Sequence, residues 1–393
     1  MDSAARGARI ATIDGLRGIA VVLVVWYHVW QVSWQSAVVP VLNVSFQPLA
    51  ETGWLGVELF FFISGFVLTV PFVRARLAGT PEPTWAHFFG RRVMKIVPSY
   101  VLCIVVLLAI GYQTYAHRWE EVRDIAFHLL FVHNWFASTY GSINGVLWSL
   151  GVEIQFYVLF PLLIFAFLSY PIRTGIAMIA VANGWRIWAL TANHYFLGQR
   201  EAQLPAYLDL FALGMLCAYA YTWLARHPVH VEKRRWLFSL LMVAGIVGFW
   251  LLANNCYTIA HVDKEWPEAW KVHFRTLTAL DIGATALGSL FAFRWLQVVL
   301  ANRVLLFLAA ISYNLYLWHQ VIARELLRFH LPPFVTADPH NDRVWMFAYA
   351  FVAVPAAIAF SALVTYAFEQ PLLRLRLRPK AALTRAAKSG ATV

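Results

Sequence analysis

IATIDGLRGIAVVLVVWYHVWQVSW, residues 10–34, is an apolar run long enough to cross a lipid bilayer as one helix. Two of its ionisable side chains, Arg17 and His28, lie eleven residues apart. Eleven residues make about three helical turns, so both side chains share one face, about 16 Å apart along the axis. A cation in hydrocarbon costs roughly 3 kcal/mol or more, and a chain that carries this cost usually uses the charge. The run therefore predicts a membrane helix with chemistry on one side.

The rest of the chain has the composition of a membrane protein. Of its 393 residues, 61% are hydrophobic and only 13% are charged, about half the charged fraction of a soluble domain. We predict an all-α, polytopic fold of about ten transmembrane helices. The expected spans are residues 13–32, 54–73, 96–113, 143–168, 174–190, 205–225, 236–253, 276–293, 304–323 and 344–368.

The positive charge lies mainly in one set of loops between these spans. This asymmetry predicts that both termini are cytoplasmic. We expect a multi-pass protein of the plasma (inner) membrane. The net charge of +11 is better explained by anionic lipid than by nucleic acid, which we do not expect as a partner. We expect a membrane domain over residues 1–378, a basic, disordered tail over 379–393, and no disulfide among the three cysteines.

The first span offers an acid–base pair. His28 could take a proton from a hydroxyl group and return it, while Arg17 could bind a phosphate or carboxylate. Asp14 lies one turn before Arg17 and is a supporting candidate. The alternative is that Arg17 reaches lipid phosphate and His28 is a hydrogen-bonded core residue.

Carboxylates enter two other spans. Glu58 approaches from the His28 side and could orient that histidine, or could be an interfacial carboxylate in water. Glu153 lies four residues after Ser149 on the same helix face, and a buried carboxylate needs a partner or a proton. Ser64 and Gly65 are expected to form a helix-packing notch.

Two further clusters complete the candidate site. Arg91, Arg92 and Lys95 lie at the expected cytoplasmic mouth of the third span, where they could bind the phosphates of a nucleotide-bearing donor or follow the positive-inside rule. Tyr316 and His319 are helical neighbours and supporting candidates for the site. His319 could bind substrate or tune a carboxylate, or equally could be a hydrogen-bonded core residue.

The expected non-cytoplasmic loops are rich in tryptophan. They contain an interfacial aromatic belt or, alternatively, a platform that stacks a sugar. The tryptophans concerned are Trp119, Trp135, Trp266 and Trp270. No histidine cluster has the spacing of a metal site, and we expect no metal cofactor.

Five motifs in order resemble acyltransferase family 3, the integral-membrane O-acyltransferases, over residues 10–378. They are Arg17 with His28, LFFFISGF at 59–66, Arg91 and Arg92 before Pro98 and Tyr100, LWSLGVEIQFY at 147–157, and SYNLYLWH at 312–319.

The resemblance implies ten membrane helices and transfer of a short acyl group from acyl-CoA to a hydroxyl of a saccharide, glycolipid or small molecule. It implies that His28 is the general base, that Arg17 assists it or contacts the donor, and that Glu153 lies in the catalytic channel. Arg91 and Arg92 would bind the donor, and Lys95 stands where an arginine is frequent. A C-terminal hydrolase-like domain found in some members is expected to be missing.

Intramembrane acids, a histidine and an arginine would also suit a proton-coupled transporter or a flippase for a glycolipid. The family motifs and the lack of a visible inverted repeat favour the enzyme.

Overall fold

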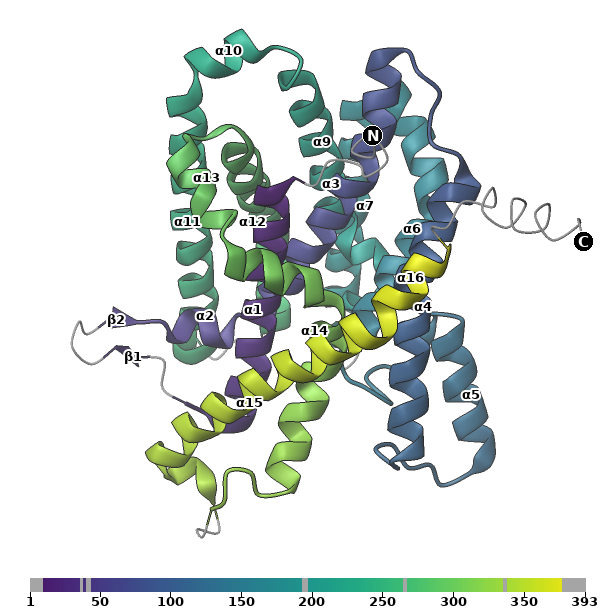
Figure 1. Ribbon diagram of the computed structural model, residues 1–393, viewed down its shortest axis with the longest axis vertical. Helices are drawn as coiled ribbons and strands as arrows, with labels where there is room; N and C mark the ends of the chain where they lie inside the picture. Colours follow the sequence, from purple (N-terminus) through teal and green to yellow (C-terminus); the bar gives the residue numbers. More distant parts are fainter. Residues whose placement is uncertain are drawn as a thin grey trace, which may run out of the picture.

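The apolar runs of the sequence form long helices in the computed structural model (Figure 1). The structure describes residues 10–35, 38–39, 44–192, 197–263, 267–334 and 338–376. The long helices are α1 (Ala11–Ser33), α3 (Leu55–Ala78), α4 (Trp85–Ala109), α6 (Trp148–Ser169), α7 (Pro171–Ala192), α9 (Leu208–Leu224), α11 (Arg235–Thr258), α12 (Pro267–Phe291), α14 (Arg303–Arg328) and α15 (Arg343–Leu363). The all-α, polytopic prediction is therefore confirmed.

Short elements connect these helices. They are β1 (Val38–Val39), β2 (Val44–Ser45), α2 (Gln47–Glu51), α5 (Arg118–Leu129), η1 (His133–Trp135), α8 (Leu197–Glu201), η3 (Leu204–Tyr207), α10 (Pro228–Lys233), η4 (Ile259–Asp263), α13 (Arg294–Leu300), η5 (Pro339–Asn341), η6 (Val364–Glu369) and α16 (Gln370–Arg376). The two strands form a small antiparallel hairpin, in which Val38 pairs with Ser45.

Eight helical stretches in the described part of the chain are long and apolar enough to cross a membrane. The other two predicted spans correspond to α7 and α12, which contain charged residues such as Arg186 and Arg275. All ten predicted ranges thus contain a long helix, and the count of ten crossings stays a prediction. The orientation of the termini also stays a prediction, and the expected tail over 379–393 lies outside the described residues.

Two helices begin earlier than the apolar pattern indicated. Helix α4 starts at Trp85, where the Thr84 hydroxyl caps it by accepting a hydrogen bond from the His87 amide at 3.4 Å. Helix α12 starts at Pro267, so Arg275 is a buried helical residue and not a loop residue. In both cases charged side chains in the first turns hid the helix from a hydropathy pattern.

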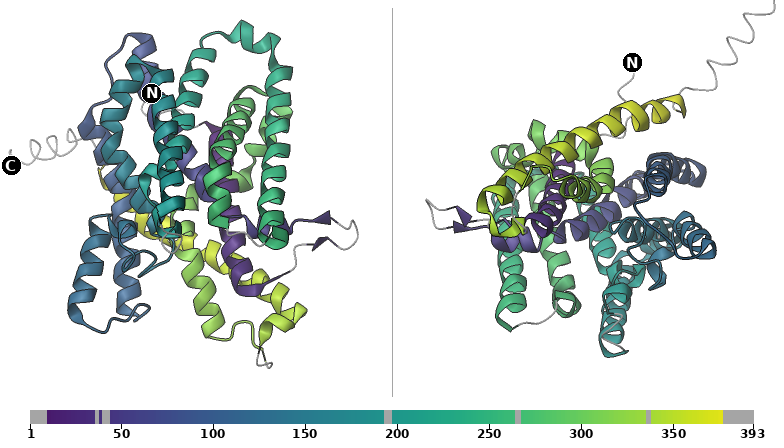
Figure 2. Two further views of the ribbon diagram at one scale, coloured as in Figure 1. Left: turned by 180° about the vertical axis from the view of Figure 1, so that it is seen from behind. Right: turned by 90° about the horizontal axis from the view of Figure 1, so that it is seen from below.

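Helix α1 lies at the centre of the bundle, where it packs against α3, α12, α13, α14 and α15 (Figures 1 and 2). Small residues permit this close packing. A Cβ atom added to Gly18 would lie 2.4 Å from the backbone oxygen of Leu305 on α14. The same holds where α3 meets α9, because a Cβ on Gly65 would lie 2.4 Å from the Phe211 oxygen. The predicted packing role of Gly65 is confirmed.

The tryptophans of the expected non-cytoplasmic loops differ in their exposure, whereas the three cysteines are alike. Trp270 is buried on α12 and donates a hydrogen bond from Nε1 to Asn255 at 2.8 Å, so it is neither at the membrane interface nor available to stack a sugar. Trp119 and Trp135 are exposed, while Trp266 lies outside the described residues. All three cysteines are buried and unpaired, as predicted.

Candidate active site

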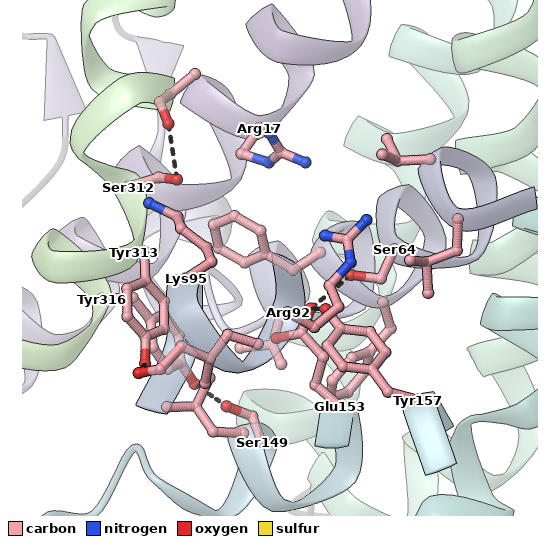
Figure 3. A pocket seen from close by; sticks show the side chains of 18 of the residues that line it. Arg17, Ser64, Arg92, Lys95, Ser149, Glu153, Tyr157, Ser312, Tyr313 and Tyr316 are labelled. Carbon is pink, nitrogen blue, oxygen red and sulfur yellow. Dashed lines mark hydrogen bonds between the residues drawn. The ribbon is translucent and has the colours of Figure 1, made fainter. Parts of the chain in front are cut away.

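A cavity of about 220 Å³ opens between α1, α3, α4, α6 and α14. It is lined by three of the cationic side chains that were predicted for the site, Arg17 from α1 and Arg92 and Lys95 from α4. Figure 3 shows the guanidinium groups of Arg17 and Arg92 directed toward the same space. The early start of α4 explains this arrangement, because a helix holds Arg92 and Lys95 three residues apart on one face. The cavity is therefore suited to an anionic group.

Glu153 supplies the negative charge of the cavity. Its Oε1 atom accepts a hydrogen bond from the Ser64 hydroxyl at 2.7 Å and another from the Tyr157 hydroxyl. The Arg92 guanidinium lies over the Tyr157 ring, 5.6 Å from its centroid. The sequence predicted Ser64 only as part of a packing notch. Its hydroxyl in fact holds a carboxylate from a helix 89 residues away.

Lys95 also joins α4 to other parts of the bundle. It forms an ion pair with Glu369 and lies 5.5 Å from the centroid of the Tyr313 ring. The other Glu369 oxygen accepts a hydrogen bond from Asn314 at 3.0 Å. Glu369 therefore contacts residues of both α4 and α14. The ion pair between Lys95 and Glu369 connects α4 to the end of η6, which follows α15.

Tyr316 marks one boundary of the cavity. Its hydroxyl lies 2.6 Å from the Ser149 hydroxyl and 3.2 Å from the Val146 carbonyl oxygen. Ser149 also donates to Val146 at 3.0 Å, so the Tyr316 hydroxyl donates to Val146 or Ser149 within one small network. Ser149 and Glu153 were predicted to share one face of α6, and both line the cavity.

His319 lies one helical turn beyond Tyr316 on α14, and neither His319 nor its partner His28 on α1 lines the cavity. The Nδ1 atom of His28 lies 3.0 Å from Nε2 of His319, and the Tyr316 ring centroid lies 5.9 Å from that of His319. The two predicted residues of α1 are therefore in different surroundings. Arg17 lines the cavity, while the Tyr316 side chain adjoins the histidine pair at the other end.

The contacts of the two imidazoles define their tautomers. His319 Nδ1 lies 2.9 Å from the Leu315 carbonyl oxygen, which can only accept, so Nδ1 carries the hydrogen and Nε2 is an acceptor. His28 Nδ1 faces this acceptor and the Val24 carbonyl oxygen at 2.9 Å, so it also carries hydrogen. In the neutral ring the unprotonated nitrogen of His28 is then Nε2. This is the atom that can accept a proton.

Other predicted residues have different partners. Asp14 contacts Arg17 at 3.2 Å, as its spacing suggested. Arg91 is exposed and does not line the cavity. Glu58 forms a buried ion pair with Arg275 at 2.8 Å, whereas the side-chain partner of His28 is His319.

The sequence did not predict the buried ion pairs between helices. Arg275 also faces Glu201 at 3.7 Å, and Arg186 on α7 binds Asp209 on α9 at 2.8 Å. The signal was present, since each is an ionisable group within or beside a span, but the partner of each comes from a distant segment. These pairs stabilise the bundle away from the cavity.

His128 and His133 pack face to face, with ring centroids 3.9 Å apart. Although five residues separate them, the turn after α5 brings them together. Asp124 binds His128 at 3.0 Å. The described residues contain no group of three or more metal-ligating side chains.

The comparisons with known proteins agree with the motifs. The chain is 27% identical over 329 residues to O-acetyltransferase OatA of Staphylococcus aureus (strain NCTC 8325 / PS 47), which covers 79% of this chain and 50% of that protein. It is 25% identical over 329 residues to peptidoglycan O-acetyltransferase OatA of Listeria monocytogenes, covering 80% of this chain and 49% of that protein. The chain thus spans about half the length of these relatives. No solved structure matches. The family described as an acyltransferase domain matches residues 10–366, and the chain belongs to this family.

Proposed function

We propose that this protein is an integral-membrane O-acyltransferase that moves a short acyl group, acetyl above all, from acyl-CoA to a hydroxyl of a carbohydrate. The observation that carries the proposal is the spatial order of the polar groups that α1, α4 and α14 contribute. A cavity with Arg17, Arg92 and Lys95 is followed by Tyr316 and then by a histidine whose Nε2 is unprotonated. The family membership and the relatives named O-acetyltransferases support the reaction class.

The cationic cavity is the proposed donor site. CoA carries phosphates, and guanidinium groups bind phosphates with paired hydrogen bonds. Glu153 keeps the cavity from being uniformly positive and holds Ser64 and Tyr157 in place. We assign this end to the cytoplasm, where acyl-CoA is made, and the membrane to the plasma membrane. Arg91 would then contribute to the surface potential that attracts the donor.

His28 is the proposed general base. Its Nε2 takes the proton of the acceptor hydroxyl as the oxygen bonds to the thioester carbonyl carbon. The carbon–sulfur bond then breaks, and the thiolate leaves with the proton from the imidazolium. His319 holds the Nδ1 hydrogen of His28 throughout, which keeps Nε2 as the reacting nitrogen.

Tyr316 would separate the two ends of the reaction path. Its ring lies beside the His319 ring and its hydroxyl is bonded to the Ser149 and Val146 network. When Arg17 and Arg92 hold the phosphates of the donor, its thioester reaches His28 once the Tyr316 side chain turns aside. The rotation breaks one or two hydrogen bonds, each worth about 1 kcal/mol net, which thermal motion supplies readily.

The test is transfer of radiolabelled acetyl from acetyl-CoA in membranes that contain the full chain. Wild-type protein should label a carbohydrate acceptor, and His28→Ala should lose the label by at least 100-fold at equal expression. His230→Ala is the control, because His230 is exposed on α10 and remote in sequence from the cavity helices. Full activity of His28→Ala would contradict the mechanism, and absence of any labelled carbohydrate with the wild-type protein would contradict the function.

A further inference from the structure

A second cavity, of about 190 Å³, lies beside the C-terminal turns of α1. Tyr27 and Trp30 of α1 line one wall, and Trp54, at the start of α3, lines another. Two carboxylates, Glu51 and Glu268, complete the polar part of the lining together with Lys271 and Thr52. None of these groups lines the cavity that contains Arg17.

The aromatic wall is a platform and not a set of scattered rings. Tyr27 and Trp30 are one helical turn apart, with ring planes 23° apart and centroids 6.4 Å apart. Trp54 already has a partner, since the Lys271 ammonium lies 4.4 Å from the centroid of its ring. The Tyr27 and Trp30 pair therefore offers a stacking surface in this cavity, where Tyr257 is the remaining aromatic residue.

The carboxylates are held in place and can accept further hydrogen bonds. Glu51 accepts one hydrogen bond from Gln47 at 2.9 Å and faces His261 Nε2 at 2.6 Å, one contact on each oxygen. A carboxylate has about four acceptor sites, so each oxygen keeps capacity for a hydroxyl. Glu268 lies 3.9 Å from the Lys271 ammonium, a loose ion pair.

The charge of this cavity differs from that of the first. Two carboxylates and one ammonium repel phosphate groups, whereas the Arg17 cavity attracts them. Flat rings that meet C–H faces, with carboxylates that accept hydroxyl hydrogens, form a site for a neutral polyol with apolar ring faces. That combination is the chemistry of a saccharide.

The platform also borders the proposed general base. The Tyr27 ring meets the His28 ring edge-on, with centroids 5.0 Å apart. His28 does not itself line this cavity, so the contact places the cavity one residue along α1 from the proposed base.

We infer that the cavity formed by Tyr27, Trp30, Glu51 and Glu268 is the saccharide subsite of this protein and holds part of the acceptor one residue along α1 from His28. This inference rests on the proposed function, because it names where the acceptor binds.

The test measures binding without acetyl-CoA, so that it is independent of transfer. The full chain is placed in lipid nanodiscs, and saturation-transfer NMR is recorded with chitotetraose as the probe. Wild-type protein should transfer saturation to the sugar ring protons. Trp30→Ala, and separately the double variant Glu51→Gln with Glu268→Gln, should raise the dissociation constant at least tenfold, while Trp30→Phe keeps a ring and retains most of the affinity.

Trp119→Ala is the matched control, because Trp119 is an exposed tryptophan on α5 that does not line this cavity. It should bind as wild type does. Elution from a sizing column and the melting temperature show that each variant is folded. Absence of a signal with the wild-type protein, or unchanged binding by folded Trp30→Ala and by the glutamine double variant, would overturn the inference. Sugar binding with no acetyl transfer would instead leave this site intact and contradict the proposed function.

Discussion

His28 and His319 form a hydrogen bond between Nδ1 and Nε2 at 3.0 Å, although 291 residues separate them in the chain. The bond joins the first helix to α14 and leaves Nε2 of His28 as the basic nitrogen. His319 is itself fixed by the Leu315 carbonyl oxygen at 2.9 Å. A backbone atom thus sets the protonation pattern of the proposed base through one intermediate ring.

Removing the acceptor nitrogen of His319 should slow the chemical step. We expect His319→Leu to lower kcat roughly 100-fold, because a misoriented base loses about that much. His319→Gln offers a carbonyl oxygen that can accept the Nδ1 hydrogen of His28 and should recover part of the loss. The KM for acetyl-CoA should stay within twofold in both variants, since His319 does not line the cationic cavity. Equal loss in the two variants would show that His319 acts only as packing.

The sequence predicted donor binding by two neighbouring arginines, but the structure places only one of them in the cavity. Arg92 lines the cavity, whereas Arg91 is exposed outside it. We expect Arg92→Gln to raise the KM for acetyl-CoA roughly tenfold or more, because a hydrogen bond to a charged group is worth about 1.5–3 kcal/mol. Arg91→Gln should change it less than twofold at 0.15 M salt, where screening weakens distant charges. Initial rates over a range of acetyl-CoA concentrations measure both, and an equal rise in KM would contradict the assignment of Arg92 to the donor.

The sequence could predict which residues are polar within a span, but not which helix supplies their partners. Arg17, Arg92, Glu153, Ser149 and Tyr316 were all predicted and all line one cavity. Local periodicity gives the face of each helix, and a membrane protein has few polar residues to choose from. The order in which helices pack is set by contacts between distant segments, which a single sequence does not display.

The ion pairs between helices that the sequence did not predict all join segments that are distant in the chain. Nothing near Glu58 points to Arg275, and nothing near Lys95 points to Glu369, which lies 274 residues away. Helix starts were missed for a different reason. A hydropathy pattern discards the charged first turns of α4, although Thr84 provides a capping signal that could have located its start.

Close packing of α3 on α9 makes a clear stability test. A Cβ atom on Gly65 would lie 2.4 Å from the Phe211 oxygen, so Gly65→Ala must push two backbones apart. We expect a loss of roughly 1–3 kcal/mol, the usual cost of an overpacked core, seen as a lower melting temperature in detergent. Gly184→Ala on α7 is the control, because no atom lies within 4 Å of its added Cβ and alanine favours the helix. Equal melting temperatures for the two variants would contradict the packing described for α3 and α9.

The stacked pair of His128, at the end of α5, and His133, at the start of η1, predicts how stability depends on pH. Burial, together with the neighbouring His128, lowers the pKa of His133 to about 3 from its ordinary value of 6.5. The unfolded chain therefore binds a proton below pH 6.5 that the folded protein refuses until about pH 3, and stability falls as the pH falls through this window. At pH 5 the loss is about 2 kcal/mol for this one group. The melting temperature should drop between pH 7.5 and pH 5, and His133→Phe, which keeps an aromatic ring against His128, should flatten this slope. His230→Asn, on exposed α10, should keep the wild-type slope. If His133→Phe were as sensitive to acid as the wild-type protein, the protonation of other groups would govern its acid response.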